Sequence, residues 1–170
     1  FRPPEKKGDT GQMYSYWRYD TEIGRICIVE QQGNITHILF EKDAPPEESV
    51  ERETPLLQEA AKQLREYFAG EHQVFDLPLA PKGTSFQMAA WHALTTIPYG
   101  ETRSYKQIAE QIGNPKACRA VGLANNRNPI AIVIPCHRVI GSDGKLVGYG
   151  GGLPVKEYLL EMEKRYKNKS

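Results

Sequence analysis

The stretch "SYKQIAEQIGNPKACRAVGLANN" occupies residues 104–126 and contains two short helix patterns around a tight turn. Ser104 and Gln107 form a capping-box pair, which predicts the start of the first helix, and a glycine ends it. The second pattern restarts at once, with Asn114 as the expected cap and Pro115 at the first helical position. Two helices joined in this way predict a helix-turn-helix, although many helix pairs bind nothing.

The charge of the chain is distributed unevenly around this motif. Residues 1–83 contain 10 Lys and Arg and 15 Asp and Glu, a net charge of −5. Residues 84–170 contain 12 Lys and Arg and 6 Asp and Glu, a net charge of +6, and residues 102–145 hold seven of these basic side chains. A basic half indicates an anionic partner, most commonly nucleic acid, whereas a solvated face without a partner is the plainer alternative.

The first half of the chain has the pattern of a small α/β domain. Three segments rich in aromatic and β-branched residues, within 14–20, 24–31 and 35–42, predict strands, and the last two are joined by turn residues as in a hairpin. Thr54 and Pro55 then open a helix with apolar residues at helical spacing, Leu57, Ala61, Leu64 and Phe68.

The second half is mostly helical outside the helix-turn-helix. A capping box at Thr84 and Gln87 starts one helix. The apolar run "AIVIP" (131–135) predicts a buried strand, and turn residues at 142–144 predict a hairpin after it. The final helix, "LPVKEYLLEMEKRY" (153–166), has Glu163 at the margin of its apolar stripe. That stripe consists of Val155, Leu159, Met162 and Tyr166.

The segment "IPCHRVI" (134–140) places a cysteine and a histidine side by side, Cys136 and His137. A nucleophile, a metal ligand and core packing are all open readings of this pair. A thiol attacks as the thiolate, which needs a neighbouring base or cation near neutral pH. Adjacent strand residues face opposite ways, so the pair can cooperate only at a bend, such as one at Pro135. A histidine base also needs an orienting acid, and Glu163 fits that role.

Composition argues against several other classes of protein. The three cysteines, Cys27, Cys118 and Cys136, are too few and too scattered for a disulfide framework. The sequence also lacks the CxxC pair that a zinc site commonly uses. We therefore expect no metal and no cofactor. The chain has neither an apolar run near 18 residues nor a signal-peptide pattern at its start, so we expect an intracellular protein without a membrane span.

The signature "IPCHRVI" closely resembles the active-site signature of the O6-alkylguanine-DNA alkyltransferases, the methylated-DNA–protein-cysteine methyltransferases. The resemblance covers residues 84–170 in detail, including "FQMAAWHALTTIPYGETRSYKQIAEQIGNPKACRAVGLANNRNP" and "GYGGGLPVKEYLLEMEK". It implies a ribonuclease H-like α/β domain at 1–78, with a small three-stranded antiparallel sheet plus helices. A linker at 79–83 would lead to a mainly helical domain at 84–170 with a winged-helix-like helix-turn-helix.

The resemblance also implies an activity. Such a protein flips O6-alkylguanine, mainly O6-methylguanine, out of duplex DNA and transfers the alkyl group irreversibly to its own cysteine, here Cys136; O4-methylthymine is a second candidate substrate. His137, oriented by Glu163, would deprotonate Cys136 through a bridging water. Tyr105 would help to turn the nucleotide out and serve the guanine as a proton donor.

The family pattern further implies binding residues. Arg119 would fill the place vacated in the base stack, and DNA would be bound through its minor groove with little sequence preference. The implied DNA-binding residues are Tyr105, Asn114, Lys116, Ala117, Arg119, Gly122 and Arg127. The implied pocket residues are Asn128, Pro135, Val139, Tyr149 and Gly150.

Three other classes of protein share some of these features. Non-catalytic damage-binding relatives replace the cysteine, so the presence of Cys136 argues against that class. The transferase part of an adaptive-response regulator and a cysteine hydrolase are further alternatives. We expect a monomer in the cytoplasm, associated with the nucleoid in a bacterium or located in the nucleus in a eukaryote.

Overall fold

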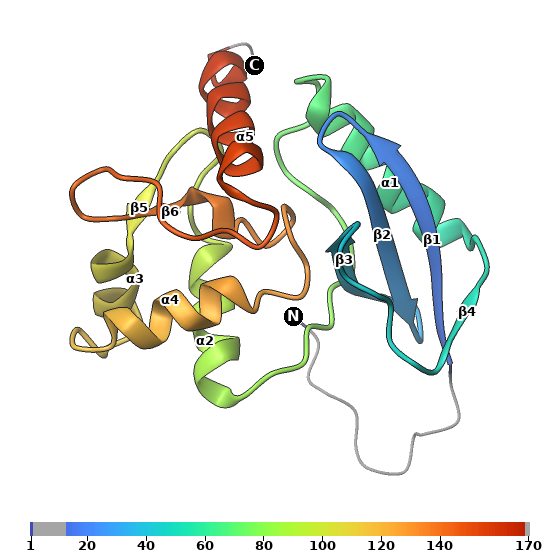
Figure 1. Ribbon diagram of the computed structural model, residues 1–170, viewed down its shortest axis with the longest axis horizontal. Coiled ribbons are helices and arrows are strands. Elements are labelled where there is room, and N and C mark those ends of the chain that lie inside the picture. The colour runs from blue at the N-terminus through green and yellow to red at the C-terminus, as the bar shows by residue number, and fades with distance from the viewer. Residues whose placement is uncertain (2–12, 169–170) are drawn as a thin grey trace. The chain divides into compact units, whose positions relative to one another are not determined.

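The computed structural model describes Phe1 and residues 13–168, and the chain divides into two compact units, Phe1–Lys82 and Gly83–Ser170. The first unit is an α/β unit and the second is mainly helical (Figure 1). This organisation agrees with the predicted fold class.

The first unit is built on a four-stranded sheet of order β3-β2-β1-β4. The predicted strands form β1 (Tyr14–Thr21), β2 (Gly24–Gln31) and β3 (Asn34–Phe40), and they pair antiparallel as expected. The prediction lacked β4 (Ser49–Glu51), which pairs parallel with β1 and makes the sheet mixed. The loop after β3 returns the chain to the edge of β1, where the unpaired N–H and C=O groups of β1 form hydrogen bonds with three further residues.

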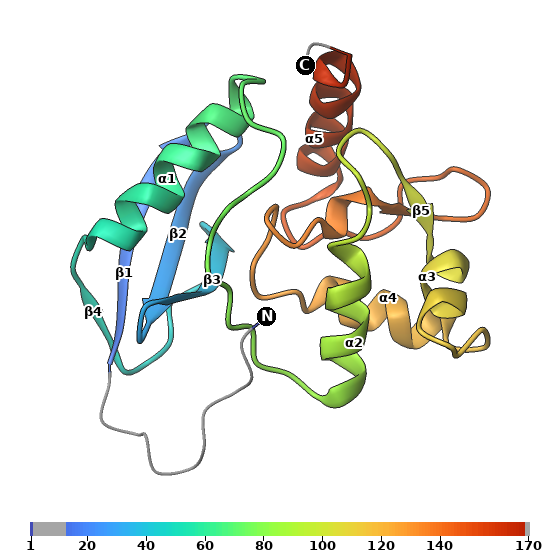
Figure 2. The ribbon, with the colours of Figure 1, turned by 180° about the vertical axis from the view of Figure 1, so that it is seen from behind.

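Helix α1 (Pro55–Phe68) covers one face of this sheet and lies in front of it in Figure 2. The predicted start is confirmed, because the Thr54 hydroxyl accepts a hydrogen bond of 3.2 Å from the Leu57 amide. The predicted apolar stripe is also confirmed, since all four of its residues are buried. Burying this stripe against the sheet forms the core of the unit.

The segment that the sequence predicted as a linker partly belongs to the sheet. The Ile35 amide donates to the Pro78 carbonyl at 2.8 Å, and the Ala80 amide donates to the Ile35 carbonyl at 2.9 Å. Residues 78–80 therefore run along the outer edge of β3. The two prolines of this stretch argue against strand pairing because proline has no amide hydrogen, but the pairing here needs only the carbonyl of Pro78 and the amide of Ala80.

In the second unit, α4 packs against both α2 and α3, as Figure 1 also shows. The two predicted capping boxes, at Thr84 and Ser104, are both formed. The predicted turn at 142–144 is present, since the Gly144 amide donates to the Gly141 carbonyl at 2.9 Å, but the strand before it, β6, pairs in parallel with β5 and forms no hairpin. The elements are α2 (Ser85–Leu94), β5 (Arg103–Ser104), α3 (Tyr105–Gln111), α4 (Cys118–Asn126), a 3₁₀ helix (Cys136–Arg138), β6 (Val139–Ile140) and α5 (Leu153–Tyr166).

The second helix of the helix-turn-helix begins later than predicted. Asn114 is not its cap; instead, the Asn114 carbonyl accepts a 3.0 Å bond from the Ala117 amide in a separate turn. Helix α4 begins at Cys118, after Ala117, whose side chain makes no capping bond. The Asn-Pro pair has the composition of a helix start, but it is equally good turn chemistry, and here it forms the turn.

The predicted buried strand at 131–135 is wrong, although most of the segment is buried. Its backbone folds into two successive γ-turns. In the first, the Val133 amide donates to the Ala131 carbonyl at 2.8 Å around Ile132, whose φ is +74°. In the second, the Cys136 amide donates to the Ile134 carbonyl at 2.8 Å around Pro135. A buried apolar run predicts burial reliably, but it does not distinguish a strand from turns.

Gly83 is a sensitive position at the start of the second unit. A Cβ atom there would lie 2.6 Å from the ring of Trp91, which is buried and whose Nε1 donates to the Ala124 carbonyl at 2.8 Å. We predict that Gly83→Ala lowers the free energy of unfolding by about 1–3 kcal/mol, because this anchored ring cannot move aside easily. Denaturant titration measures the change.

Gly150→Ala is the matched control, because a Cβ at Gly150 meets no described atom within 4 Å. We expect this control to change the free energy of unfolding by less than about 0.5 kcal/mol. Equal stability of the two variants would contradict the prediction.

Candidate active site

The predicted acid–histidine pair is present at the centre of the second unit. His137 and Glu163 are both fully buried, and His137 Nε2 lies 2.6 Å from Glu163 Oε2. The 3₁₀ helix that carries His137 packs directly on α5, which carries Glu163. The sequence interpretation of Glu163 as the buried acid therefore matches the geometry.

Glu163 also binds Arg138, the residue that follows the histidine. Arg138 Nε donates to Oε1 at 2.8 Å and Nη2 donates to Oε2 at 3.0 Å, while Nη1 donates to the Ile97 carbonyl at 2.8 Å. The Gly100 amide donates to Oε1 at 3.2 Å. Burial alone would raise the pKa of Glu163, but His137 and Arg138 outweigh it and hold the pKa well below its usual range.

The same arrangement makes His137 a neutral base. Burial lowers the pKa of His137 and outweighs the opposite effect of Glu163. With Nε2–H donating to the carboxylate, Nδ1 carries the free lone pair. Nδ1 is buried and has no hydrogen-bond partner in the part of the chain that the structure describes. It is therefore free to take a proton.

The thiol of Cys136 is protonated at rest. Cys136 is only 5% exposed, and burial raises its pKa to about 11. A hydrogen bond from the Asn128 side chain, the positive charge of Lys156 and nearby backbone amides act in the opposite direction without cancelling the burial. A nucleophile in this state needs a base such as His137 at the moment of attack.

Asn128 shapes the segment that leads to the nucleophile. Its Nδ2 donates to the Ile134 carbonyl at 2.8 Å, and its Oδ1 accepts from the Ile130 amide at 3.0 Å. One amide side chain thus spans the two γ-turns and fixes where Cys136 begins. The predicted pocket residues Pro135 and Val139 lie on the same segment and are buried.

Sequence reasoning missed Lys156, which is fully buried on α5. Its Nζ donates to the carbonyls of Val139 at 2.6 Å and Val147 at 3.0 Å, and lies 3.5 Å from that of Gly148. Burial lowers the pKa of Lys156, and Cys136 opposes that shift. The available signal was its position one heptad before Glu163, which places both residues on one helix face.

Two tyrosines lie beside the thiol. The Tyr105 hydroxyl donates to the Val147 carbonyl at 3.0 Å, so this carbonyl accepts hydrogen bonds from both Tyr105 and Lys156. Burial raises the pKa of Tyr105, and the nearby Cys136 adds a smaller increase. Burial also raises the pKa of Tyr149 well above its usual value. Both phenols therefore stay protonated and can donate hydrogen bonds. Gly150, the remaining predicted pocket residue, follows Tyr149 on the same loop.

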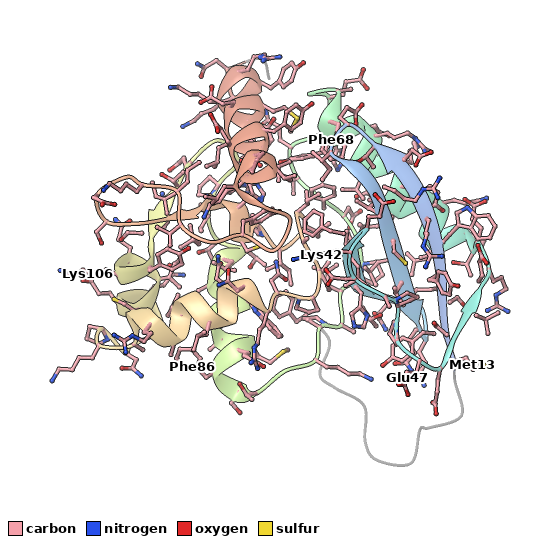
Figure 3. The ribbon with its side chains drawn as sticks, viewed as in Figure 1. Met13, Lys42, Glu47, Phe68, Phe86 and Lys106 are labelled. Carbon is pink, nitrogen blue, oxygen red and sulfur yellow. The ribbon has the colours of Figure 1, made fainter. Side chains whose placement is uncertain are left out.

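The predicted DNA-binding residues lie on the helix-turn-helix, and most of their side chains are exposed. Arg119 and Arg127 are exposed at the two ends of α4, and Asn114 and Lys116 are exposed in the turn before it. Ala117 and Gly122 are half-buried, and the Gly122 position faces the Tyr105 ring. Lys106 on α3 also extends outward (Figure 3).

Within Phe1 and residues 13–168, no three His, Cys, Asp or Glu side chains gather closely enough to hold a metal ion. No helix in the described part of the chain has the length and apolar character needed to cross a membrane.

The comparisons with known proteins identify the class to which this fold and site belong. Residues 14–81 match the ribonuclease-like domain of 6-O-methylguanine DNA methyltransferase, and residues 85–165 match the DNA-binding domain of the same family. The chain therefore belongs to the 6-O-methylguanine DNA methyltransferase family, as the sequence resemblance indicated.

Individual relatives agree with this assignment. The chain is 53% identical to a methylated-DNA–protein-cysteine methyltransferase of Methanosarcina acetivorans, over 89% of this chain and 98% of the relative. It is 47% identical to the constitutive enzyme of that name in Bacillus subtilis, over 92% and 100%. A crystal structure of Mycobacterium tuberculosis OGT in complex with DNA superimposes with a TM-score of 0.85 at 48% identity, over 89% and 94%.

The buried carboxylate gives a prediction for stability. Glu163→Gln should lower the free energy of unfolding by about 3–5 kcal/mol at neutral pH, because Arg138 is left buried without a counter-charge. The depressed pKa of Glu163 means that its contribution is full above the unfolded value of about 4.3 and is lost as pH falls further. Denaturant titration at pH 7 and pH 3 should therefore show a smaller penalty at pH 3.

The matched control is Glu161→Gln on the exposed side of the same helix. It should change the free energy of unfolding by less than about 0.5 kcal/mol. An equal penalty for Glu163→Gln at both pH values would show that the carboxylate charge does not stabilise the fold.

The resting thiol gives a second prediction. In the native protein, iodoacetamide should modify Cys136 slowly at neutral pH, and the rate should rise towards a midpoint near pH 11 because the thiol is buried and protonated. Peptide mass mapping distinguishes Cys136 from Cys27 and Cys118. The same protein in denaturant is the control, with an expected midpoint of about 8.5. A native midpoint below 8 would contradict a protonated resting thiol.

Proposed function

We propose that this protein repairs alkylated DNA by transferring the alkyl group from O6 of a guanine to Sγ of its own Cys136. The observation that carries the proposal is the buried thiol of Cys136 followed directly by His137, which Glu163 holds as a neutral base. The family assignment and the DNA complex of the M. tuberculosis relative support DNA as the substrate.

The reaction balances with the groups at this site. The thiol proton passes to Nδ1 of His137, through a bridging water, and Sγ attacks the alkyl carbon. The carbon–oxygen bond breaks, its electron pair goes to the guanine, and the guanine is protonated. Tyr105 donates a proton to the guanine, and the proton held on His137 replaces the one that Tyr105 has lost. The product is a thioether on Cys136, which does not revert, so each molecule acts once.

The burial of Cys136 makes base flipping necessary. An alkyl group inside a DNA duplex cannot meet a thiol inside a protein unless the nucleotide leaves the base stack and enters the site. A damaged base pair is weaker, so its extrusion costs less than that of a normal pair. Tyr105 must then exchange its bond to the Val147 carbonyl for contacts with the nucleotide, while Lys156 keeps that carbonyl hydrogen-bonded.

The exposed face of α4 is the surface that we propose meets DNA. Its exposed residues recur at helical spacing, and Ala120 among them, with the half-buried Ala117 and Gly122, permits close approach to the minor groove. Arg119 would enter the base stack, whereas few side chains on this face can read base edges. Little sequence preference and a strong dependence on salt follow. The exposed face consists of Arg119, Ala120, Leu123, Asn126 and Arg127.

Val139, Tyr149 and Gly150 would border the pocket for the flipped guanine, with backbone groups of this border as its polar partners. One unit of this chain carries the whole nucleophilic site, so a monomer suffices for the reaction. The protein would act wherever its DNA lies, in the cytoplasm with the nucleoid or in the nucleus.

The test is the intact mass of the protein after mixing with a duplex that contains one O6-methylguanine. We expect an increase of one methylene mass per molecule, mapped to Cys136, with no second addition under excess DNA. Cys136→Ser is the matched variant and should bind the same duplex without gaining mass. Tight binding by the wild type without any mass gain would refute transfer and favour a damage-binding protein.

A further inference from the structure

Arg138 is a buried cation next to the base, and the reaction proposed above does not use it. It is 7% exposed and follows His137 in the 3₁₀ helix. Its guanidinium makes two hydrogen bonds to Glu163 and one to the Ile97 carbonyl, and its Cζ lies 5.7 Å from the centroid of the Tyr99 ring. A planar guanidinium held in this way keeps one orientation, so its charge stays fixed against the carboxylate.

The carboxylate of Glu163 receives four hydrogen bonds, and Arg138 supplies two of them. Oε1 accepts from Arg138 Nε at 2.8 Å and from the Gly100 amide at 3.2 Å. Oε2 accepts from Arg138 Nη2 at 3.0 Å and from His137 Nε2 at 2.6 Å. An ionised carboxylate has about four lone-pair positions, so all of them are used. The carboxylate therefore stays ionised and leaves the Nε2 proton on the histidine.

The surroundings of His137 contain one anion and two cations. The anion is Glu163, and the cations are Arg138 and Lys156. Helix α2, which also packs on the 3₁₀ helix, buries only apolar residues, and its His92 is exposed. Removal of Arg138 would make these surroundings more negative, which favours the imidazolium. The nearby groups that stay neutral, because burial raises their pKa values, are the Cys136 thiol and the phenols of Tyr99, Tyr105 and Tyr149.

We propose that Arg138 is a positioning residue that sets the proton affinity of His137, and thereby the pH range in which Cys136 reacts. This inference rests on the proposed function, because it concerns the transfer of the thiol proton to Nδ1. Glu163 orients the imidazole, and Arg138 prevents the carboxylate from drawing a second proton onto it. Burial lowers the pKa of His137, and the charge of Arg138 adds to this effect. Nδ1 is then available to the thiol at neutral pH and below.

The experiment follows single-turnover transfer from a saturating O6-methylguanine duplex by intact mass, between about pH 5 and pH 9. Saturation removes the pH dependence of DNA binding from the rate. The rate should rise with pH and level off once His137 is neutral, with a wild-type midpoint below the value of about 6.5 for a free imidazole. In Arg138→Met the midpoint should rise by about one pH unit, because the side chain keeps a similar length but loses its charge.

Two further variants separate charge from packing. Arg138→Lys keeps the charge but loses the forked hydrogen bonds, so its rate should fall while its midpoint stays within about 0.3 pH units of the wild type. The double variant Arg138→Met/Glu163→Gln removes both charges and leaves no unpaired buried ion. Its midpoint should return towards the wild-type value.

The matched control is Arg165→Met, which removes a cation from the exposed side of α5 and should leave the midpoint unchanged. Thermal unfolding identifies any variant that fails to fold, and the wild-type midpoint tests the inference without a variant.

Two results would overturn the inference. One is a wild-type midpoint at or above the free imidazole value. The other is an Arg138→Met variant that slows transfer by the same factor at every pH, because Arg138 would then only support the fold. Failure of the proposed function itself looks different, since the wild type would gain no mass at any pH.

Discussion

The carboxylate of Glu163 is the charge around which the second unit is arranged. It is buried on α5 and binds two consecutive residues of the 3₁₀ helix, His137 through one oxygen and Arg138 through both. A buried anion is tolerated only when it is fully paired, and the guanidinium supplies that pairing. The pairing leaves the imidazole neutral, so the protein keeps a charged carboxylate and an uncharged base in direct contact.

This arrangement separates stability from reactivity. Arg138 compensates the charge of Glu163 permanently, whereas His137 remains free to gain and lose a proton at Nδ1. The thiol of Cys136 is meanwhile kept protonated by its burial. Arg138 thus balances the charge of the buried carboxylate, and the histidine stays neutral with Nδ1 able to accept the thiol proton.

Local rules predicted much of the fold. The capping residues Thr54, Thr84 and Ser104 all act as caps, because a cap depends only on a few neighbouring residues. Glu163 was found as the acid because it borders an apolar stripe. The γ-turns before Cys136 were missed, since they depend on the Asn128 side chain and not on the apolar residues that form them. Lys156 was missed because a lysine is ordinarily a surface residue, and its carbonyl partners are distant in sequence.

The dependence on α5 has a consequence for the order of events during synthesis. Glu163 and Lys156 both lie on this helix, so residues 103–140 emerge from the ribosome before either partner has been synthesised. Until α5 docks, Arg138 has no anion, His137 has no orienting group, and the loop carbonyls of Val139 and Val147 lack their lysine. A nascent chain therefore carries the nucleophile without the means to activate it. The site is therefore complete only once α5 has docked on the 3₁₀ helix.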